Sequence, residues 1–136
     1  MARWRYHSFF LLLVSILLPP GLLMARAQVT ATQTQVQRLT LQGFERYRKN
    51  DLEGAAALFR QATTLAPADG LTWFNLGLVL ADQGKLADAA DAYEKSIPLL
   101  SKQNIPKLSL SNACNNLALV YYRQKRFEDA SGRKQS

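Results

Sequence analysis

A spacing of 34 residues recurs in this chain of 136 residues and constrains its fold more than any other feature. Four pairs of similar residues share the spacing: Gly43 with Gly77, Leu52 with Leu86, Ala55 with Ala89, and Phe59 with Tyr93. A fixed period of this size is typical of structural repeats, in which each copy forms one supersecondary unit and buries its apolar face against its neighbours. The chain is long enough for one small domain, so we expect a short array of such units.

The clearest copy has the pattern of two antiparallel helices. Its first half places apolar or small residues at helical spacing on one face, and so does its second half after a turn at residues 83–85: Trp73, Leu76, Gly77, Leu80, then Leu86, Ala89, Tyr93, Ile97. Gly77 and Ala89 allow the two helices to cross closely, and the large Trp73 and Tyr93 fill the space on either side. The pattern predicts a helical hairpin.

These residues resemble the tetratricopeptide repeat family. The copy at 70–103 matches at Trp73, at Leu76 and Gly77, and at Ala89 and Tyr93, but it has Ser96 where the family usually has Ala and Ser101 where it usually has Pro. The copy at 36–69 matches best in its second half, at Ala55, Phe59, Ala62 and Pro67. The resemblance implies an all-α fold of tandem antiparallel helical hairpins, an α-solenoid of about two and a half to three repeats.

The third copy is incomplete. Residues 111–136 match the first helix and the start of the second, ending in a polar tail, and residues 104–110 form an insertion or loop that shifts the copy out of the 34-residue spacing. After Ala130 the sequence is polar and broken by Gly132, so we expect the second helix to be a stub of little more than one turn. Either the uncovered face of this copy binds something, another copy of the chain included, or the chain is the truncated front end of a longer repeat protein.

The first 27 residues have the pattern of a signal peptide. Two arginines precede seventeen uncharged residues at 8–24, and Ala25, Arg26 and Ala27 form a small-x-small cleavage pattern. We expect cleavage after Ala27 and export to a periplasm or cell envelope, so that contact with the membrane is transient. The alternative is an anchor at 8–24, which is near the lower length limit for a spanning helix. The polar residues 28–35 are expected to be a linker.

Composition argues against catalysis. The sole histidine, His7, belongs to the expected leader, which excludes His-dependent nucleophiles and zinc sites from the rest of the chain. Asp88, Asp91 and Glu94 are expected to be solvated on a helix surface, and the single cysteine, Cys114, is expected to be a small buried apolar group, with an oxidisable thiol as the alternative. We therefore predict no enzyme, no metal and no cofactor. The net charge of +7 falls to +4 without the leader, and the basic tail has no stacking aromatics, so no nucleic-acid partner is expected.

The resemblance implies that ligands bind the concave face, which the first helices of the repeats line. The residues at the ligand-facing positions that would suit an apolar or helical peptide, with charged residues at the margin, are Phe44, Tyr47, Arg48, Phe74, Leu78, Asp82, Leu119, Tyr122 and Arg123. Any one of the aromatics could instead pack against the adjacent helix. The expected function is that of an exported adaptor for a protein or peptide segment. The alternative is a structural module that associates with itself or with further repeats.

Overall fold

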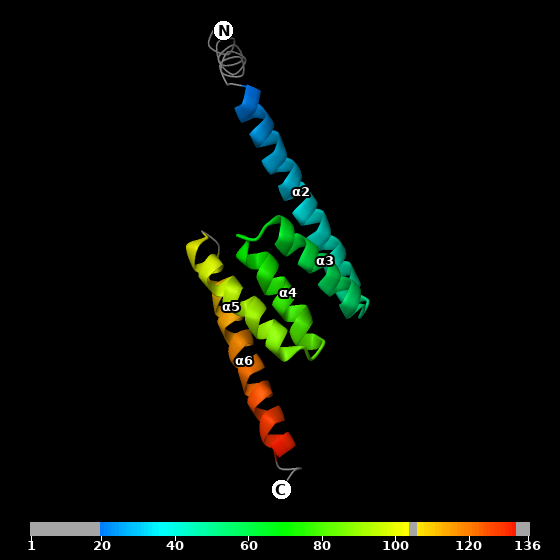
Figure 1. The fold of residues 1–136 in the computed structure, drawn as a ribbon, viewed down its shortest axis with the longest axis vertical. Coiled ribbons are helices and arrows are strands. Elements are labelled where there is room, and N and C mark those ends of the chain that lie inside the picture. The colour runs from blue at the N-terminus through cyan, green and yellow to red at the C-terminus, as the bar shows by residue number, and fades with distance from the viewer. Residues whose placement is uncertain (1–19, 104–105, 133–136) are drawn as a thin grey trace, which may run out of the picture. The chain divides into compact units, whose positions relative to one another are not determined.

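The computed structural model describes residues 20–103 and 106–132, and the greater part of the predicted leader, residues 1–19, lies outside them. The described residues form five helices and no strand: α2 (Pro20–Arg48), α3 (Leu52–Leu65), α4 (Gly70–Asp82), α5 (Leu86–Lys102) and α6 (Lys107–Gly132) (Figure 1). The all-α fold that the sequence predicts is therefore confirmed. Among the described residues, no helix combines the length and the apolar character needed to cross a membrane.

The chain divides into two compact units, residues 1–34 and residues 35–136. In the first unit the described residues are helical from Pro20, which suits the first position of a helix because it has no N–H to leave unpaired. The threonine hydroxyls stay within the helix: those of Thr30, Thr32 and Thr34 donate to backbone carbonyls three or four residues earlier. Residues 28–35, expected to be a linker, are thus helical, because a polar sequence without Gly or Pro can continue a helix.

In the second unit the two predicted hairpins are built alike. A Cβ atom on Gly43 would lie 2.8 Å from the ring of Phe59, and one on Gly77 would lie 2.8 Å from the ring of Tyr93. The rings of α3 and α5 therefore occupy the space that a side chain on the first helix would need. The predicted reason for a glycine at position 77 is confirmed, with one refinement: Tyr93 packs directly on the glycine instead of beside it.

The turns of the two hairpins also repeat. Asn50 and Gly84, which lie 34 residues apart, both have a positive φ, 61° and 74°. After each of them, the next backbone N–H donates to the carbonyl five residues earlier, from Asp51 to Arg46 and from Lys85 to Leu80. This arrangement pairs the last carbonyls of a helix and reverses the chain, and it needs a residue that tolerates the left-handed region.

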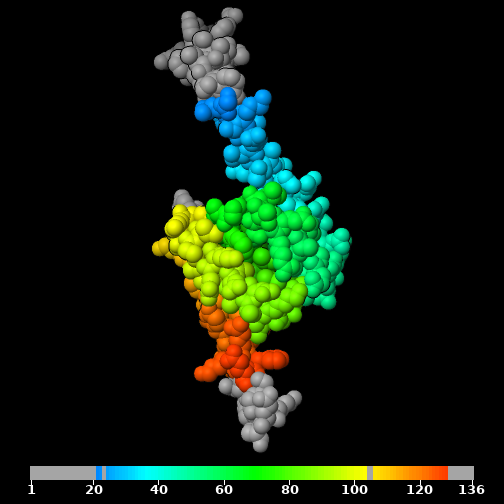
Figure 2. All heavy atoms as spheres, viewed as in Figure 1, coloured from blue at the N-terminus to red at the C-terminus, as the bar shows by residue number. Residues whose placement is uncertain are grey.

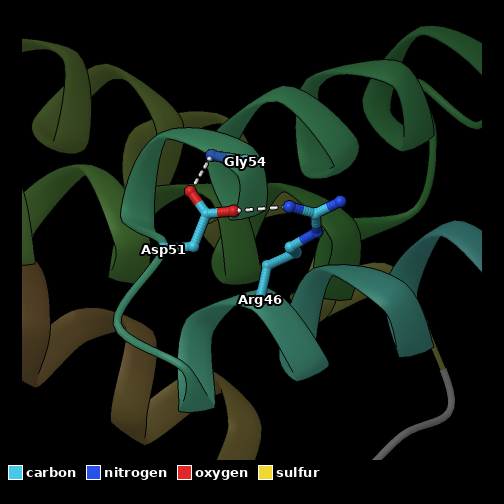
Figure 3. A network of polar contacts seen from close by, with 3 residues as sticks. All are labelled: Arg46, Asp51 and Gly54. Atoms are coloured by element: carbon cyan, nitrogen blue, oxygen red, sulfur yellow. Dashed lines mark hydrogen bonds and ion pairs between the residues drawn. The ribbon is translucent and has the colours of Figure 1, made fainter.

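The start of α3 is capped by an acidic side chain. Asp51 Oδ1 accepts a hydrogen bond from the backbone N–H of Gly54 at 2.9 Å, and Asp51 Oδ2 lies 2.8 Å from Nη1 of Arg46 (Figure 3). The backbone hydrogen bond and, next to it, the Arg46 guanidinium hold the pKa of Asp51 below its usual value. One carboxylate therefore joins the end of α2 to the beginning of α3.

The third copy differs from its prediction. The sequence predicts a loop at 104–110 and a second short helix after Phe127, whereas α6 is a single helix from Lys107 to Gly132. Lys125 lies where the other two hairpins have Asn50 and Gly84, and lysine does not favour the left-handed conformation that those turns require. Without that turn, α6 continues and ends the stack as one helix packed on α4 and α5.

The buried side of α6 shows how it joins the stack. Ala113 and Val120 are fully buried and Leu117 packs against the main core, while other faces of the helix stay exposed. Cys114 is among the exposed residues, which corrects the prediction that it is buried. Its counterparts in the first two copies, Leu39 and Trp73, belong to complete hairpins, whereas none of the described residues covers the corresponding face of α6.

The departure from the family pattern at Ser96 has a structural explanation. Ser96 is fully buried on α5, and its hydroxyl donates to the carbonyl of Gly70, the first residue of α4, at 2.8 Å. Gly70 itself lies so close to α5 that a Cβ atom there would be 2.8 Å from the backbone nitrogen of Leu100. The small hydroxyl therefore ties the two helices together where they approach most closely.

Candidate functional site

The nine predicted ligand-facing residues, which we call the inner wall, come from the second half of α2, from α4 and from α6. They differ in exposure. The half-buried members are Phe44, Tyr47, Phe74 and Leu78, and the exposed members are Arg48, Asp82, Leu119, Tyr122 and Arg123. α4 contacts α6 directly and also lies against α3, so it is the central element of this surface.

The first polar contact of the inner wall joins two repeats. The Tyr47 hydroxyl of α2 donates a hydrogen bond to Asp82 Oδ2 of α4 at 2.5 Å. This hydrogen bond to the carboxylate raises the pKa of Tyr47, and burial and the negative charge of Asp82 act in the same direction. Two residues that the sequence assigns separately to this surface are therefore direct partners, and Asp82 reaches a ligand only together with Tyr47.

A second polar group lies beneath the wall. Asn116 Nδ2 of α6 lies 3.3 Å from the Tyr93 hydroxyl of α5 and donates to it. Burial raises the pKa of Tyr93 to about 12, the Asp82 charge adds to the rise, and the Arg123 charge opposes it. Charges from α4 and α6 thus act on one buried hydroxyl. The sequence reasoning missed this pair as part of the site, although an asparagine beside apolar positions of a first helix was the available signal.

Two aromatic members of the wall also serve the core. The rings of Phe44 and Phe59 meet edge to face with their centroids 5.3 Å apart, and those of Phe74 and Tyr93 lie 5.9 Å apart. Each wall aromatic therefore supports the ring that fills a hairpin, as the alternative reading of these residues allowed. Leu78, Leu119 and Tyr122 make no such ring contact with the core aromatics, so they are the apolar residues most available to a ligand. Their role as ligand contacts stays a prediction.

Outside the wall, the structure has one polar hollow of about 560 Å³ near the turn between α2 and α3. It is lined by Gln42, Glu45, Arg46, Lys49, Asp51 and Leu58. Arg46 and Asp51 already pair with each other there, as described above. Within the described ranges, no three His, Cys, Asp or Glu residues gather as a metal site would require. The wall itself offers apolar contacts, hydrogen-bonding groups and isolated charges, which suit binding.

Two antiparallel hairpins stacked in register and closed by a further helix define a helical-repeat protein. Comparison with known families agrees: two family models, both described as tetratricopeptide repeat, match residues 40–104 and residues 110–132. The chain belongs to the tetratricopeptide repeat family. This repeat is generally a non-catalytic module that mediates protein–protein interactions. No curated protein matches the chain.

Proposed function

We propose that this protein is an exported adaptor that binds a segment of a partner protein on the inner wall and catalyses no reaction. The observation that carries the proposal is the composition of that wall. Apolar side chains that are only half-buried or exposed lie on the same helices as a hydrogen-bonded tyrosine and aspartate, and the repeat family to which the chain belongs mediates protein–protein contacts. An apolar floor with a few placed polar groups is what peptide-binding surfaces use.

The charges of the wall suggest how a segment would be oriented. Arg48, Asp82 and Arg123 occupy the same position in the three copies and are all exposed. Asp82 is engaged by Tyr47, so the two arginines supply the unshared charge at the two ends of the wall. A bound segment with an apolar middle and an acidic or amide-rich end would satisfy both the floor and these margins.

Export is the second part of the proposal, and the sequence of residues 1–27 supports it. The arginines, the uncharged run and the small residues before Gln28 together match a leader that is removed. The exported protein would begin at Gln28 and reside in a periplasm or cell envelope. Sequencing the N-terminus of the protein recovered from an envelope fraction tests this directly: an N-terminus at Met1 would contradict removal of the leader.

The binding proposal is tested by capturing partners from the envelope fraction with matched variants. Leu78→Glu places a charge on the wall and should abolish capture of the partner recovered with the unchanged protein. Leu41→Glu is the control, because Leu41 is an exposed leucine of α2 that does not belong to the wall. Both variants should keep their helical content by circular dichroism. Equal capture by the two variants would contradict the proposed site.

A further inference from the structure

Large apolar side chains are unevenly exposed in this protein, and α6 has the densest group of them. Its exposed members are Leu108, Leu119, Tyr121, Tyr122 and Phe127, with between 46% and 77% of their surface accessible. The remainder of the second unit exposes only scattered leucines. The orange and red second half of α6 also extends past the end of the α4 and α5 hairpin (Figure 2). Exposed apolar groups on one helix mark an interaction surface.

The hairpins show what the uncovered face of α6 is built to receive. Ala118 lies 41 residues after Gly77 and takes its place on α6, where it is exposed. In the complete hairpins the residue at this register contacts a ring from an antiparallel helix. One turn before Ala118 lies the small Cys114, and one turn after it lies the large Tyr122. We call these three residues the open face; all of them are exposed.

We propose that two copies of this chain associate through the open face, with their α6 helices antiparallel and crossing at Ala118. A two-fold axis at Ala118 brings Tyr122 of each copy over Cys114 of the other, since both residues lie four positions from the axis. Each ring then covers a small residue, which repeats the packing of Phe59 on Gly43 and of Tyr93 on Gly77. The same surface is used by both copies, as a closed symmetric dimer requires.

The charges along α6 favour the antiparallel direction. With the axis at Ala118, Lys107 of one copy lies near Glu128 of the other, and Lys125 lies opposite Ser111. A parallel pair would instead place Lys125 beside Lys125 and Tyr122 against Tyr122, which costs like-charge repulsion and two large side chains at one level. The antiparallel pair has opposite charges near both ends of a contact about 30 Å long. The apolar part of the contact is small, so the dimer should be weak and should form at high protein concentration.

This association goes beyond the proposed adaptor function and is tested independently of it, because Ala118 is not an inner-wall residue. The first test is cross-linking of the purified protein. In a Cys114→Ser background, Ala118→Cys places one thiol of each copy on the two-fold axis, and mild oxidation should yield a covalent dimer on a non-reducing gel. Asn112→Cys in the same background is the control, since Asn112 is exposed on another side of α6.

The native cysteine supplies a further check on the register. The Cys114 residues of the two copies lie eight positions apart along the antiparallel pair, about 12 Å, which is beyond the reach of a disulfide. The unchanged protein should therefore dimerise without cross-linking. Efficient cross-linking through Cys114, or equal cross-linking through positions 112 and 118, would overturn the proposed crossing point.

The second test measures association without a cross-link. Sedimentation of the unchanged protein over a range of concentrations should show the mass rising from one copy towards two. Ala118→Glu should hold the protein at the mass of one copy over the same range, with unchanged helical content because position 118 is exposed. A protein that stays monomeric at every concentration, or an Ala118→Glu variant that associates as well as the unchanged protein, would refute the proposal.

Discussion

Gly77→Ala tests the packing on which both hairpins depend. The added methyl group would lie 2.8 Å from Cε1 and 2.9 Å from Cδ1 of the Tyr93 ring, so the ring would have to move. Tyr93 is only 1% exposed and therefore has no free space to move into. Overpacking of a core by one methyl group costs about 1 to 3 kcal/mol. Alanine in place of glycine in a helix recovers about 1 kcal/mol, so we expect a net loss of about 1 to 2 kcal/mol in the free energy of unfolding.

The assay is urea unfolding followed by circular dichroism, carried out on a double-mutant cycle. Tyr93→Leu removes the ring and lowers stability by itself because it leaves a cavity. In that background the clash is absent, so adding Gly77→Ala should leave stability unchanged or increase it by up to about 1 kcal/mol. The sign of the effect of the alanine thus reverses between the two backgrounds. A Gly77→Ala variant that is more stable than the unchanged protein would refute this reasoning.

Three further predictions concern single contacts. Asp51→Ala should lower the melting temperature more than Asp51→Asn, because asparagine can still cap α3 although it loses the charge paired with Arg46; the stability that the Asp51 carboxylate contributes should be lost as the pH falls through its lowered pKa. Ser96→Ala should cost about 1 kcal/mol in urea unfolding, since it removes the buried hydrogen bond to the Gly70 carbonyl. The Tyr93 pKa of about 12 exceeds its ordinary value of 10, so between these pH values the unfolded chain has released a proton that the native state retains. The free energy of unfolding should therefore fall as the pH rises from 10 to 12, and Tyr93→Phe should remove part of that slope.

The sequence predicted the two hairpins because the residues that shape them are local and repeated. Gly43 and Gly77 share one spacing with Phe59 and Tyr93, and in both copies the structure places the glycine against the ring. The period therefore carried more than helical propensity: it marked a pair of complementary shapes. The small residues could be assigned to helix crossings without any knowledge of tertiary structure, since few other roles require glycine inside an amphipathic helix.

The candidate site was predictable only in part. The wall positions follow from the repeat register, but the register does not show that Tyr47 gives its proton to Asp82 in a hydrogen bond between two repeats. Nor does it show that Asn116 reaches Tyr93 across the boundary between α5 and α6. Both contacts join residues of different copies, and their geometry depends on how the copies stack. A pattern within one copy contains no information on that stacking.

The third copy shows how much a single backbone position can decide. Phe127 follows the register of Leu52 and Leu86, so the sequence pattern indicates the start of a second helix there. The pattern takes no account of the conformation at the preceding turn, where Asn50 and Gly84 provide the positive φ in the first two copies and Lys125 provides no residue suited to it. Because the turn is absent, α6 continues as one helix, and the face around Ala118 stays uncovered by the described residues. The local conformational preference of one residue thus accounts both for the failure of the predicted stub and for the surface through which we propose that two copies meet.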